Sequence, residues 1–225
     1  MAHLLDQPAW NALISGNSNL SYGTSTAKYF DKAVSIFADL EDQYSGGFKT
    51  LYDIVPDGQQ IGVFSLDKNL KAEPWSGVSR IDGLQMVYHH AAKELTGNHI
   101  IRALDSSDVP AMLSLTGQAK PGPFFEKTID FGHYHGIFSD DMLVAMAGQR
   151  FHPGAFAEIS GVCTHPDFTG KGLARQLLLH QIRRIRENDE TPFLHVTSSN
   201  VNAVKLYESI GFTTRTEICI HILKK

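Results

Sequence analysis

The sequence has little cysteine and no long hydrophobic run. Its 225 residues include only two cysteines, Cys163 and Cys219, and neither belongs to a Cys-x-x-Cys pair, which excludes a disulfide framework. No stretch approaches the roughly 18 consecutive apolar residues that cross a membrane. The N-terminus, MAHLLDQPAW, has no basic region and carries Asp6 early, so we expect no secretory signal. These absences predict a cytoplasmic protein in a reducing setting, with no membrane partner.

The sequence also lacks a strong excess of positive or negative charge. Lys and Arg together number 20 against 24 Asp and Glu, and the net charge of -4 argues against a nucleic-acid partner. The 11 histidines show no His-Glu-x-x-His spacing, so we expect no metal. Hydrophobic residues make up 42% of the chain. A chain of this size buries about 70% of its unfolded surface, which excludes wholesale disorder. Length leaves one large domain or two smaller ones open, and the sequence leaves the oligomeric state open between a monomer and a homodimer.

The first part of the chain, residues 1–97, carries no chemical motif. An amphipathic stretch, Leu4 to Ile14, comes first, and apolar spacing then predicts a helix over Ala27 to Leu40. Strands are expected after it, with Pro56-Asp57-Gly58 as a hairpin turn between the first two. Their expected ranges are Phe48 to Val55, Ile61 to Leu66 and Ile81 to Tyr88.

The pattern restarts near Thr96-Gly97-Asn98, and residues 98–225 read as a mixed α/β sheet. The expected order is β-α-α-β-β-β-α-β-α-β, with antiparallel strands in the middle joined by tight turns. Asp105 to Asp108 offer N-cap residues to the first helix, and a long amphipathic helix continues from Gly170–Gly172 to about Glu187. We therefore expect an α/β fold of mixed sheet type, divided into residues 1–97 and 98–225.

One segment combines a strand, a glycine-containing loop and a helix start. Residues 158–174 read EISGVCTHPDFTGKGLA. Backbone N–H groups at a helix N-terminus lack helical partners and attract anions, and Gly170 and Gly172 let a phosphate approach the backbone closely. A P-loop would need Ser or Thr after Lys171, and a dinucleotide fingerprint would need Gly or Ala where Arg175 stands.

A third phosphate motif fits better. Residues 169–174, TGKGLA, resemble the Arg/Gln-x-x-Gly-x-Gly/Ala pyrophosphate loop of the GNAT superfamily of N-acetyltransferases. Residues 200–212, NVNAVKLYESIGF, resemble the Asn-x-x-Ala-x-x-Leu-Tyr-x-x-x-Gly-Phe motif of the same family. The resemblance covers about residues 98–225 and is nearest to the branch with glycine N-acyltransferase. Thr169 departs from the usual Arg or Gln, which puts one side-chain contact to phosphate in doubt.

The resemblance implies acetyl-CoA as the acyl donor, coenzyme A as product and direct transfer to an amine. Tyr207 is the expected acid for the leaving sulfur, although its ring could instead only pack under the pantetheine arm. Glu158 is the expected base, although a carboxylate there is as often simply ion-paired. The residues implied to bind the cofactor are Val162, Cys163, Thr164, Thr169, Gly170, Lys171, Gly172, Leu173, Ala174, Arg175, Asn200 and Tyr207.

Acceptor recognition is expected from Pro121 to Phe125 and the helix that follows, by analogy with the family's substrate loops. Phe124 and Phe125 are candidates there, and His133 and His135 are candidates that could equally be solvated. Cys163 is expected to be a core residue rather than a nucleophile. The short C-terminal end lacks a strand that many members have, so we expect residues 1–97 to cover the sheet edge. They could also be a degenerate half of the same fold.

The resemblance leaves three functions open. The first is an N-acetyltransferase for a small amine or an amino-acid-like acceptor. The second is an acyl-CoA-binding sensor or pseudo-enzyme without turnover, and the third is a protein or peptide N-acetyltransferase. The sequence contains no motif that names the acceptor.

Overall fold

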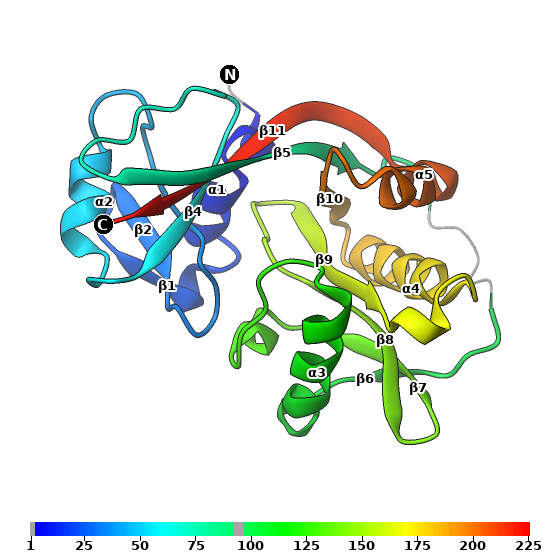
Figure 1. The fold of residues 1–225 in the computed structure, drawn as a ribbon. Helices are drawn as coiled ribbons and strands as arrows, with labels where there is room; N and C mark the ends of the chain where they lie inside the picture. Colours follow the sequence, from blue (N-terminus) through cyan, green and yellow to red (C-terminus); the bar gives the residue numbers. More distant parts are fainter. Residues whose placement is uncertain (1–2, 92–96) are drawn as a thin grey trace.

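The computed structural model describes residues 3–91 and 97–225, and one long sheet runs through both ranges (Figure 1). This eight-stranded sheet has the order β4-β11-β5-β10-β9-β8-β7-β6. Its two longest strands, β5 (Ser76–Val87) and β11 (Thr213–Lys224), cross from one lobe of the molecule to the other. We call residues 3–91 the N-terminal segment and residues 97–225 the C-terminal module.

The N-terminal segment supplies an interior strand to the sheet of the C-terminal module. Strand β5 pairs antiparallel with β10 (Thr191–Thr197) on one side and with β11 on the other. Val87 is opposite both Phe193 and Thr213. On the outer side of β11, β4 (Gln60–Ser65) adds a further antiparallel strand. Strand β4 therefore covers the sheet edge at β11, as expected for the first part of the chain. In addition, β5 fills the position between β10 and β11.

The rest of the N-terminal segment is a small sheet with two short helices. Strands β1 (Ser21–Gly23), β2 (Ala27–Phe30) and β3 (Ala38–Leu40) pair in that order, and a bridge from Phe37 to Gly62 links them to β4. Helix α1 (Pro8–Leu13) contacts all of β2, β3 and β4, whereas α2 (Phe48–Ile54) contacts β2 and β3. The 3₁₀ turns η1 (Leu4–Asp6) and η2 (Ser18–Leu20) flank α1.

Two predictions for this segment were wrong. The expected helix over Ala27 to Leu40 is the β2–β3 hairpin, because Asp31 accepts a hydrogen bond from the backbone N–H of Ala33 and turns the chain. The expected strand over Phe48 to Val55 is helix α2, whose apolar residues three and four positions apart form one buried face. Pro56-Asp57-Gly58 consequently joins a helix to a strand and is not a hairpin turn.

The elements of the C-terminal module follow the predicted order. They are β6 (Ile101–Ala103), η3 (Ser106–Asp108), α3 (Val109–Ala119), η4 (Thr128–Phe131), β7 (His135–Ser139), β8 (Met142–Gln149), β9 (Phe156–Thr164), η5 (Pro166–Phe168), α4 (Leu173–Glu187), β10, α5 (Val201–Ile210) and β11. Only the helix expected after Pro121 to Phe125 differs, because that segment forms the single 3₁₀ turn η4. Helix α3 packs with Met146 of β8 and α4 packs with its neighbour Ala147, so the two helices cover opposite faces. This confirms a mixed α/β fold.

The largest hydrophobic cluster crosses the predicted boundary between the two parts. Phe30, Phe37 and Phe64 of the N-terminal segment belong to it together with Tyr134 and Phe193 of the C-terminal module. Of the boundary expected at residues 96–98, Thr96 lies outside the described residues, as do residues 92–95. The division into two domains, and the origin of the first as a degenerate half, stay predictions.

Candidate acyl-transfer site

Strands β9 and β10 separate at Glu158 and open a cleft in the sheet. They pair in parallel only from Thr191 opposite Phe156 to Phe193 opposite Glu158. Beyond that point β9 pairs only with β8, across a bulge at which Gly161 has a φ of +63°. A Cβ atom at Gly161 would lie 3.2 Å from the Tyr134 ring, so a larger residue would have to displace the ring. The bulge therefore bends β9 away from β10 and exposes its backbone to the cleft.

A cavity of about 590 Å³ occupies this cleft. Both parts of the chain line it, with Val34, Phe37 and Phe64 from the N-terminal segment at one end. At the other end it reaches the loop before α4 and the side of α5. Seven of the residues predicted to bind the cofactor line the cavity: Val162, Cys163, Thr164, Thr169, Ala174, Asn200 and Tyr207.

The other five predicted cofactor residues, Gly170, Lys171, Gly172, Leu173 and Arg175, form the turn and first helical residues beside Thr169 and Ala174. Gly170 and Gly172 have φ values of +75° and +78°, and a Cβ added at either would meet no atom within 4 Å. The first backbone N–H of α4 with a helical partner is that of Gln176. The preceding N–H groups therefore suit a phosphate, and the residues present fit a coenzyme A pyrophosphate.

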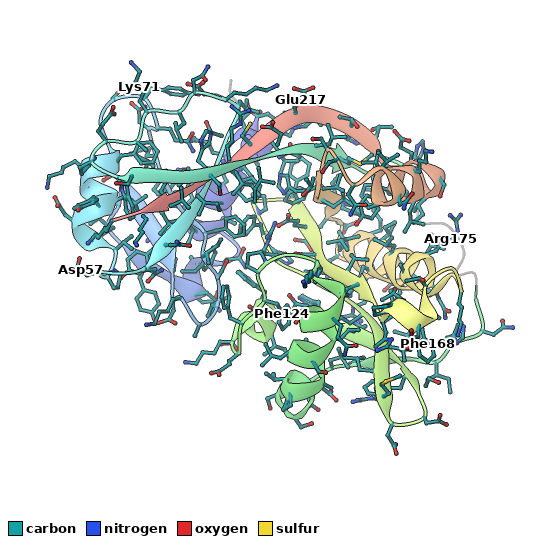
Figure 2. The ribbon with its side chains drawn as sticks, viewed as in Figure 1. Asp57, Lys71, Phe124, Phe168, Arg175 and Glu217 are labelled. Atoms are coloured by element: carbon teal, nitrogen blue, oxygen red, sulfur yellow. The ribbon has the colours of Figure 1, made fainter. Side chains whose placement is uncertain are left out.

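The side chains of the loop before α4 and of its first residues mostly contact other parts of the protein. The Thr169 hydroxyl donates to the carbonyl of Pro166, and Lys171 lies with its ammonium 4.2 Å from the centre of the Phe168 ring. Leu173 is buried beneath the sheet. Arg175 donates to the Ser209 hydroxyl at 3.0 Å and bridges α4 and α5 (Figure 2). Phosphate recognition through the backbone is therefore the role that this geometry offers.

Helix α5 carries Tyr207 into the cavity. Asn200 caps the helix by accepting from the backbone N–H of Ala203 at 3.2 Å, and Gly211 ends it with a φ of +120°. Only 9% of Tyr207 is exposed, and burial raises its pKa to about 12. Among the described residues its hydroxyl has no hydrogen-bond partner. Tyr207 is therefore a neutral phenol at physiological pH with a proton available to a ligand.

Glu158 lies at the point where the strands separate, and it is ion-paired. Arg150 donates to its two oxygens at 2.8 and 2.6 Å, and His195 Nδ1 lies 2.7 Å from Oε1. Burial alone would raise the pKa of Glu158, but the positive charge of Arg150 and the His195 contact hold the pKa at about 2. The carboxylate is therefore ionised at neutral pH. Its ion pairing is shown, whereas its role as a base stays a prediction.

A chain of polar contacts continues from Glu158 into the N-terminal segment. His195 Nε2 lies 3.0 Å from the amide nitrogen of Gln85 on β5, and the carbonyl oxygen of Gln85 accepts from Arg215. Arg215 also donates to Asp6 at 2.7 Å. Since Gln85 is fully buried, these contacts hold His195 in one orientation and tie the site to both parts of the chain.

Of the two aromatic residues predicted from the loop, only Phe124 lines the cavity. Its ring lies 5.6 Å from that of Tyr134, and it projects beside α3 (Figure 2). Phe125 is not among the lining residues. Its backbone N–H instead donates to the Thr128 hydroxyl at 2.8 Å. Phe37 and Phe64 complete this end of the cavity and were missed, because the helix expected over 27–40 gave Phe37 a different neighbourhood.

The structure places neither predicted histidine in the cavity. His135 packs against His180 of α4, with ring centres 4.4 Å apart, and His133 lies 5.9 Å from His152. Tyr134, between them in sequence, faces the cavity instead. The alternation of side chains along an extended segment explains this outcome, because adjacent residues point to opposite faces.

Other candidate chemistry is absent from the described residues. Cys163 is buried, and burial raises its pKa to about 12, as expected for a core residue rather than a nucleophile. No cluster of His, Cys, Asp or Glu suited to a metal ion is found in residues 3–91 and 97–225. Within the same ranges no helix could span a membrane.

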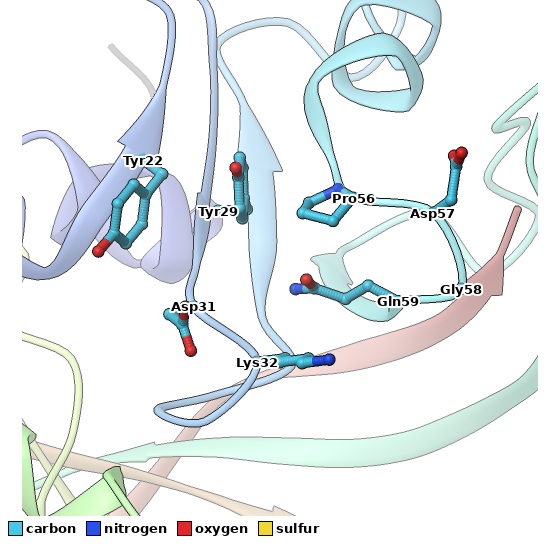
Figure 3. Close-up of a pocket in the computed structure, with 8 residues that line it drawn as sticks. All are labelled: Tyr22, Tyr29, Asp31, Lys32, Pro56, Asp57, Gly58 and Gln59. Atoms are coloured by element: carbon cyan, nitrogen blue, oxygen red, sulfur yellow. The ribbon is translucent and has the colours of Figure 1, made fainter.

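A smaller cavity of about 260 Å³ lies wholly within the N-terminal segment (Figure 3). Tyr22 and Tyr29 stack on one side of it, and Pro56 and Gln59 lie opposite. It contains none of the motif residues, and its Gln59 amide is already bonded to the carbonyl of Phe30. The larger cavity is therefore the candidate site.

Comparison with known proteins agrees with this geometry. A family model described as FR47-like protein matches residues 134–220. The [ribosomal protein bS18]-alanine N-acetyltransferase of Salmonella typhimurium is 32% identical over 123 residues, which cover 52% of this chain and 82% of that relative. The mycothiol acetyltransferase of Thermomonospora curvata is 35% identical over 75 residues, 33% of this chain and 25% of that relative.

Among solved structures, a putative acetyltransferase from the GNAT family of Novosphingobium aromaticivorans has a TM-score of 0.91 and 32% identity. The match covers 100% of this chain and 99% of that one, so it includes the N-terminal segment. A GCN5-related N-acetyltransferase from Kribbella flavida shares the fold, with a TM-score of 0.63 and 14% identity over 96% of this chain and 95% of that one. The predicted branch with glycine N-acyltransferase stays a prediction. The chain belongs to the GNAT superfamily and is an acyltransferase.

Proposed function

We propose that this protein is an acetyl-CoA-dependent N-acetyltransferase that transfers acetyl directly to the primary amine of a small or amino-acid-like acceptor. The observation that carries the proposal is that one continuous cavity is lined by the α4 loop, Tyr207 and Glu158. A donor bound along β9 and an acceptor bound beside Phe37 would therefore meet in the same cavity. The two buried free thiols, Cys163 and Cys219, agree with a cytoplasmic setting.

The donor end supplies backbone donors. The N–H groups at the start of α4 would bind the pyrophosphate, and the bulged strand from Val162 to Thr164 would lie along the pantetheine arm and polarise the thioester carbonyl. Thr169 and Ala174 would flank the phosphates, while Asn200 would shape the wall from α5. The donor supplies an activated acetyl group and a thiolate leaving group.

Two side chains would stabilise charge and transfer protons during the reaction. Tyr207 stays protonated at neutral pH and would give its proton to the departing sulfur. Glu158 stays ionised and would stabilise the positive charge that develops on the attacking nitrogen, then accept its proton directly or through a water. Because its pKa is held near 2, we expect its charge to matter more than its basicity.

Purified protein tests the proposal. Millimolar coenzyme A and acetyl-CoA should each raise the melting temperature, and a panel of amines should show acceptor-dependent release of thiol. Tyr207→Phe should lower kcat by 10²-fold or more, the scale of general acid catalysis, with the affinity for coenzyme A unchanged. An unchanged rate in this variant would remove the acid role, and no stabilisation by either ligand would contradict the proposal itself.

A peptide N-terminus is the second candidate acceptor. The relatives matched from Salmonella typhimurium and Escherichia coli act, by name, on the alanine of ribosomal protein bS18. An alanine-starting peptide in the amine panel tests this reading. A sensor without turnover is the remaining alternative, and it would show the thermal shift with coenzyme A but no acceptor-dependent thiol release from any amine.

A further inference from the structure

A second tyrosine, Tyr134, lines the same cavity as Tyr207 but packs on the opposite face of the sheet. Tyr207 belongs to the hydrophobic cluster of Leu178 on α4, whereas Tyr134 belongs to the cluster of Met112 on α3. Since α3 and α4 cover opposite faces, the two rings reach the cavity from opposite sides. The proposed acetyl transfer gives Tyr207 a role and leaves Tyr134 without one.

The Tyr134 ring is held in one position by its neighbours. A Cβ atom at Gly148 of β8 would lie 2.3 Å from Cδ1 of the ring, and one at Gly161 of β9 would lie 3.2 Å from Cε1. The missing side chains of these two glycines therefore provide the room that the ring occupies. Phe124 packs edge-to-face on the ring, and only 3% of Tyr134 is exposed. A ring packed this closely holds its hydroxyl at a fixed point of the cavity wall.

The Tyr134 hydroxyl is unpaired, and it lies at the bulge of β9. Among the described residues Oη has no hydrogen-bond partner, and it is not sealed from solvent as the unpaired Thr164 hydroxyl is. It lies 3.7 Å from the position that a Cβ atom of Gly161 would take. Burial raises the pKa of the phenol well above its usual value, so the hydroxyl stays protonated and can both donate and accept. Buried tyrosine hydroxyls usually have a partner, so this one is available to a bound ligand.

The surroundings of the hydroxyl suit a neutral polar group. Arg150 and Glu158 are the charged side chains whose fields act on the Tyr134 phenol, and they are paired with each other. A ligand atom beside Oη therefore meets neither a free cation nor a free anion. The amine that attacks a thioester has this neutral character, with N–H donors and a lone pair that must face the carbonyl carbon.

We propose that Tyr134 binds the acceptor, with its hydroxyl oxygen accepting a hydrogen bond from an N–H of the attacking amine. This bond leaves the nitrogen lone pair free to face the acetyl carbon, which a donor bound along β9 places beside the Gly161 bulge. Tyr134 holds the nucleophile on one face of the sheet, and Tyr207 protonates the leaving group on the other. This inference rests on the proposed acetyl transfer and adds a substrate contact to it.

The reaction is balanced without a further reagent. The C–N bond forms while the C–S bond of the thioester breaks. The nitrogen gives one proton to Glu158, the sulfur takes one from Tyr207, and Tyr134 keeps its own. Exchange with solvent then restores the protonation states of Glu158 and Tyr207.

Tyr134→Phe removes only the hydroxyl and tests its role. Thiol release from acetyl-CoA is measured with 2-phenylethylamine, L-phenylalanine and an alanine-starting peptide. We expect kcat/KM for each active amine to fall about 10-fold, the scale of one lost hydrogen bond, with the affinity for coenzyme A unchanged by calorimetry. Because the hydroxyl has no partner within the described chain, the melting temperature should stay the same or rise. Tyr52→Phe is the matched control, since Tyr52 packs on Trp75 outside the cavity, and its kinetics should stay at wild-type values.

The outcomes separate this inference from the proposed function. Wild-type kcat/KM in Tyr134→Phe would overturn the inference and leave N-acetylation intact, whereas no release from wild-type protein with any amine would overturn both. A lower melting temperature, or a variant that fails to fold, would assign the hydroxyl a structural role and overturn the inference. The loss should also be similar for every active amine, because the contact is made at the nitrogen that they share. A loss confined to one acceptor would place the contact on the body of that molecule and would overturn the assignment to the amine.

Discussion

The two parts of the chain build one sheet and one cavity, but they contribute different things to them. The C-terminal module supplies the backbone loop, Tyr207 and the Arg150–Glu158 pair. The N-terminal segment supplies an interior strand, β5, and apolar cavity residues such as Phe37 and Phe64. The groups that we propose to take part in the reaction thus lie in one part, whereas the other completes the sheet and lines the end of the cavity that we assign to the acceptor. Acceptor choice can therefore differ between relatives that share the motifs but lack a corresponding N-terminal segment.

Each part also contains a fully buried carboxyl group, and the pKa values of these two groups are shifted in opposite directions. Glu158 is neutralised by Arg150, and its pKa is lowered to about 2. Asp39, on β3, is fully buried without a cation, and burial raises its pKa to about 7 despite hydrogen bonds from Gln43, Leu40 and Trp10. Burial favours the neutral acid in both cases, and at Glu158 the adjacent Arg150 and His195 reverse its effect.

The largest effect is expected from separating the two parts. A protein consisting of residues 97–225 alone would lack the strand between β10 and β11, so we expect no cooperative unfolding transition by circular dichroism. Co-expressing residues 1–91 should restore the transition, because β4 and β5 can pair with the same partners. A cooperative melt of 97–225 by itself would show that the module is independent and that the N-terminal segment is an addition.

The next largest effect concerns the Arg150–Glu158 pair. Glu158→Gln leaves Arg150 buried without its counter-charge, which should lower the free energy of unfolding by about 3–5 kcal/mol at pH 7. Because the native pKa is depressed, wild-type stability should fall as the pH drops from about 4.5 to about 2, and the fall should be smaller in the variant, where other carboxyls with lowered pKa values, such as Asp108, still contribute. Urea titrations measure both quantities. Glu217→Gln, at an exposed pair with Lys68, is the control, and an equal loss there would contradict the assignment.

Asp39 should give the opposite pH dependence. Its raised pKa means that the folded state binds the proton more tightly than the unfolded state, so its stabilising contribution is complete below about 3.8 and is lost as the pH rises through about 7. Each unit of pKa shift corresponds to about 1.4 kcal/mol, so the loss should be a few kcal/mol. Asp39→Asn should flatten the urea-derived stability between pH 4 and pH 7, while a slope equal to wild type would show that another group titrates there.

The two parts differ in how well the sequence predicts them, because local signals mark the elements of one part and long-range contacts position those of the other. In the C-terminal module, helix ends are marked locally, as by Asn200 and Gly211, and the phosphate loop follows from Gly170 and Gly172. In the N-terminal segment, Phe37 is positioned by a bridge to β4 and by contact with Phe64, which are far away in sequence. Local periodicity there matched a helix that long-range strand pairing overrides.

The residues of the candidate site also fall into those that a local motif predicts and those that only long-range contacts bring into place. Glu158 and Tyr207 are recognisable because they belong to or lie next to motifs, and both line the cavity. Arg150 and His195 were missed, since a single basic residue in or just after a strand has no sequence signature, and what places both of them in the site is their contact with Glu158. His133 and His135 were chosen over Tyr134 because residue type, rather than strand direction, guided the choice.

The smallest effect is expected from two glycines that have the same φ angle. Gly170 in the phosphate loop and Gly58 before β4 both have a φ of +75°, and a Cβ at either would meet no atom within 4 Å. Replacing either by alanine should therefore cost about 1 kcal/mol of stability through backbone strain alone.

The two variants should differ only in ligand binding. At Gly170 the added methyl group would occupy space that we assign to the pyrophosphate, so the dissociation constant for coenzyme A should rise about 10-fold in Gly170→Ala and stay unchanged in Gly58→Ala. Calorimetry with coenzyme A and urea unfolding measure the two quantities separately. Equal affinity in both variants would mean that the open space at Gly170 is not where the phosphate binds. Unequal stability would mean instead that the loop is strained beyond its φ angle, because the two sites are matched in φ and in the free space around an added Cβ.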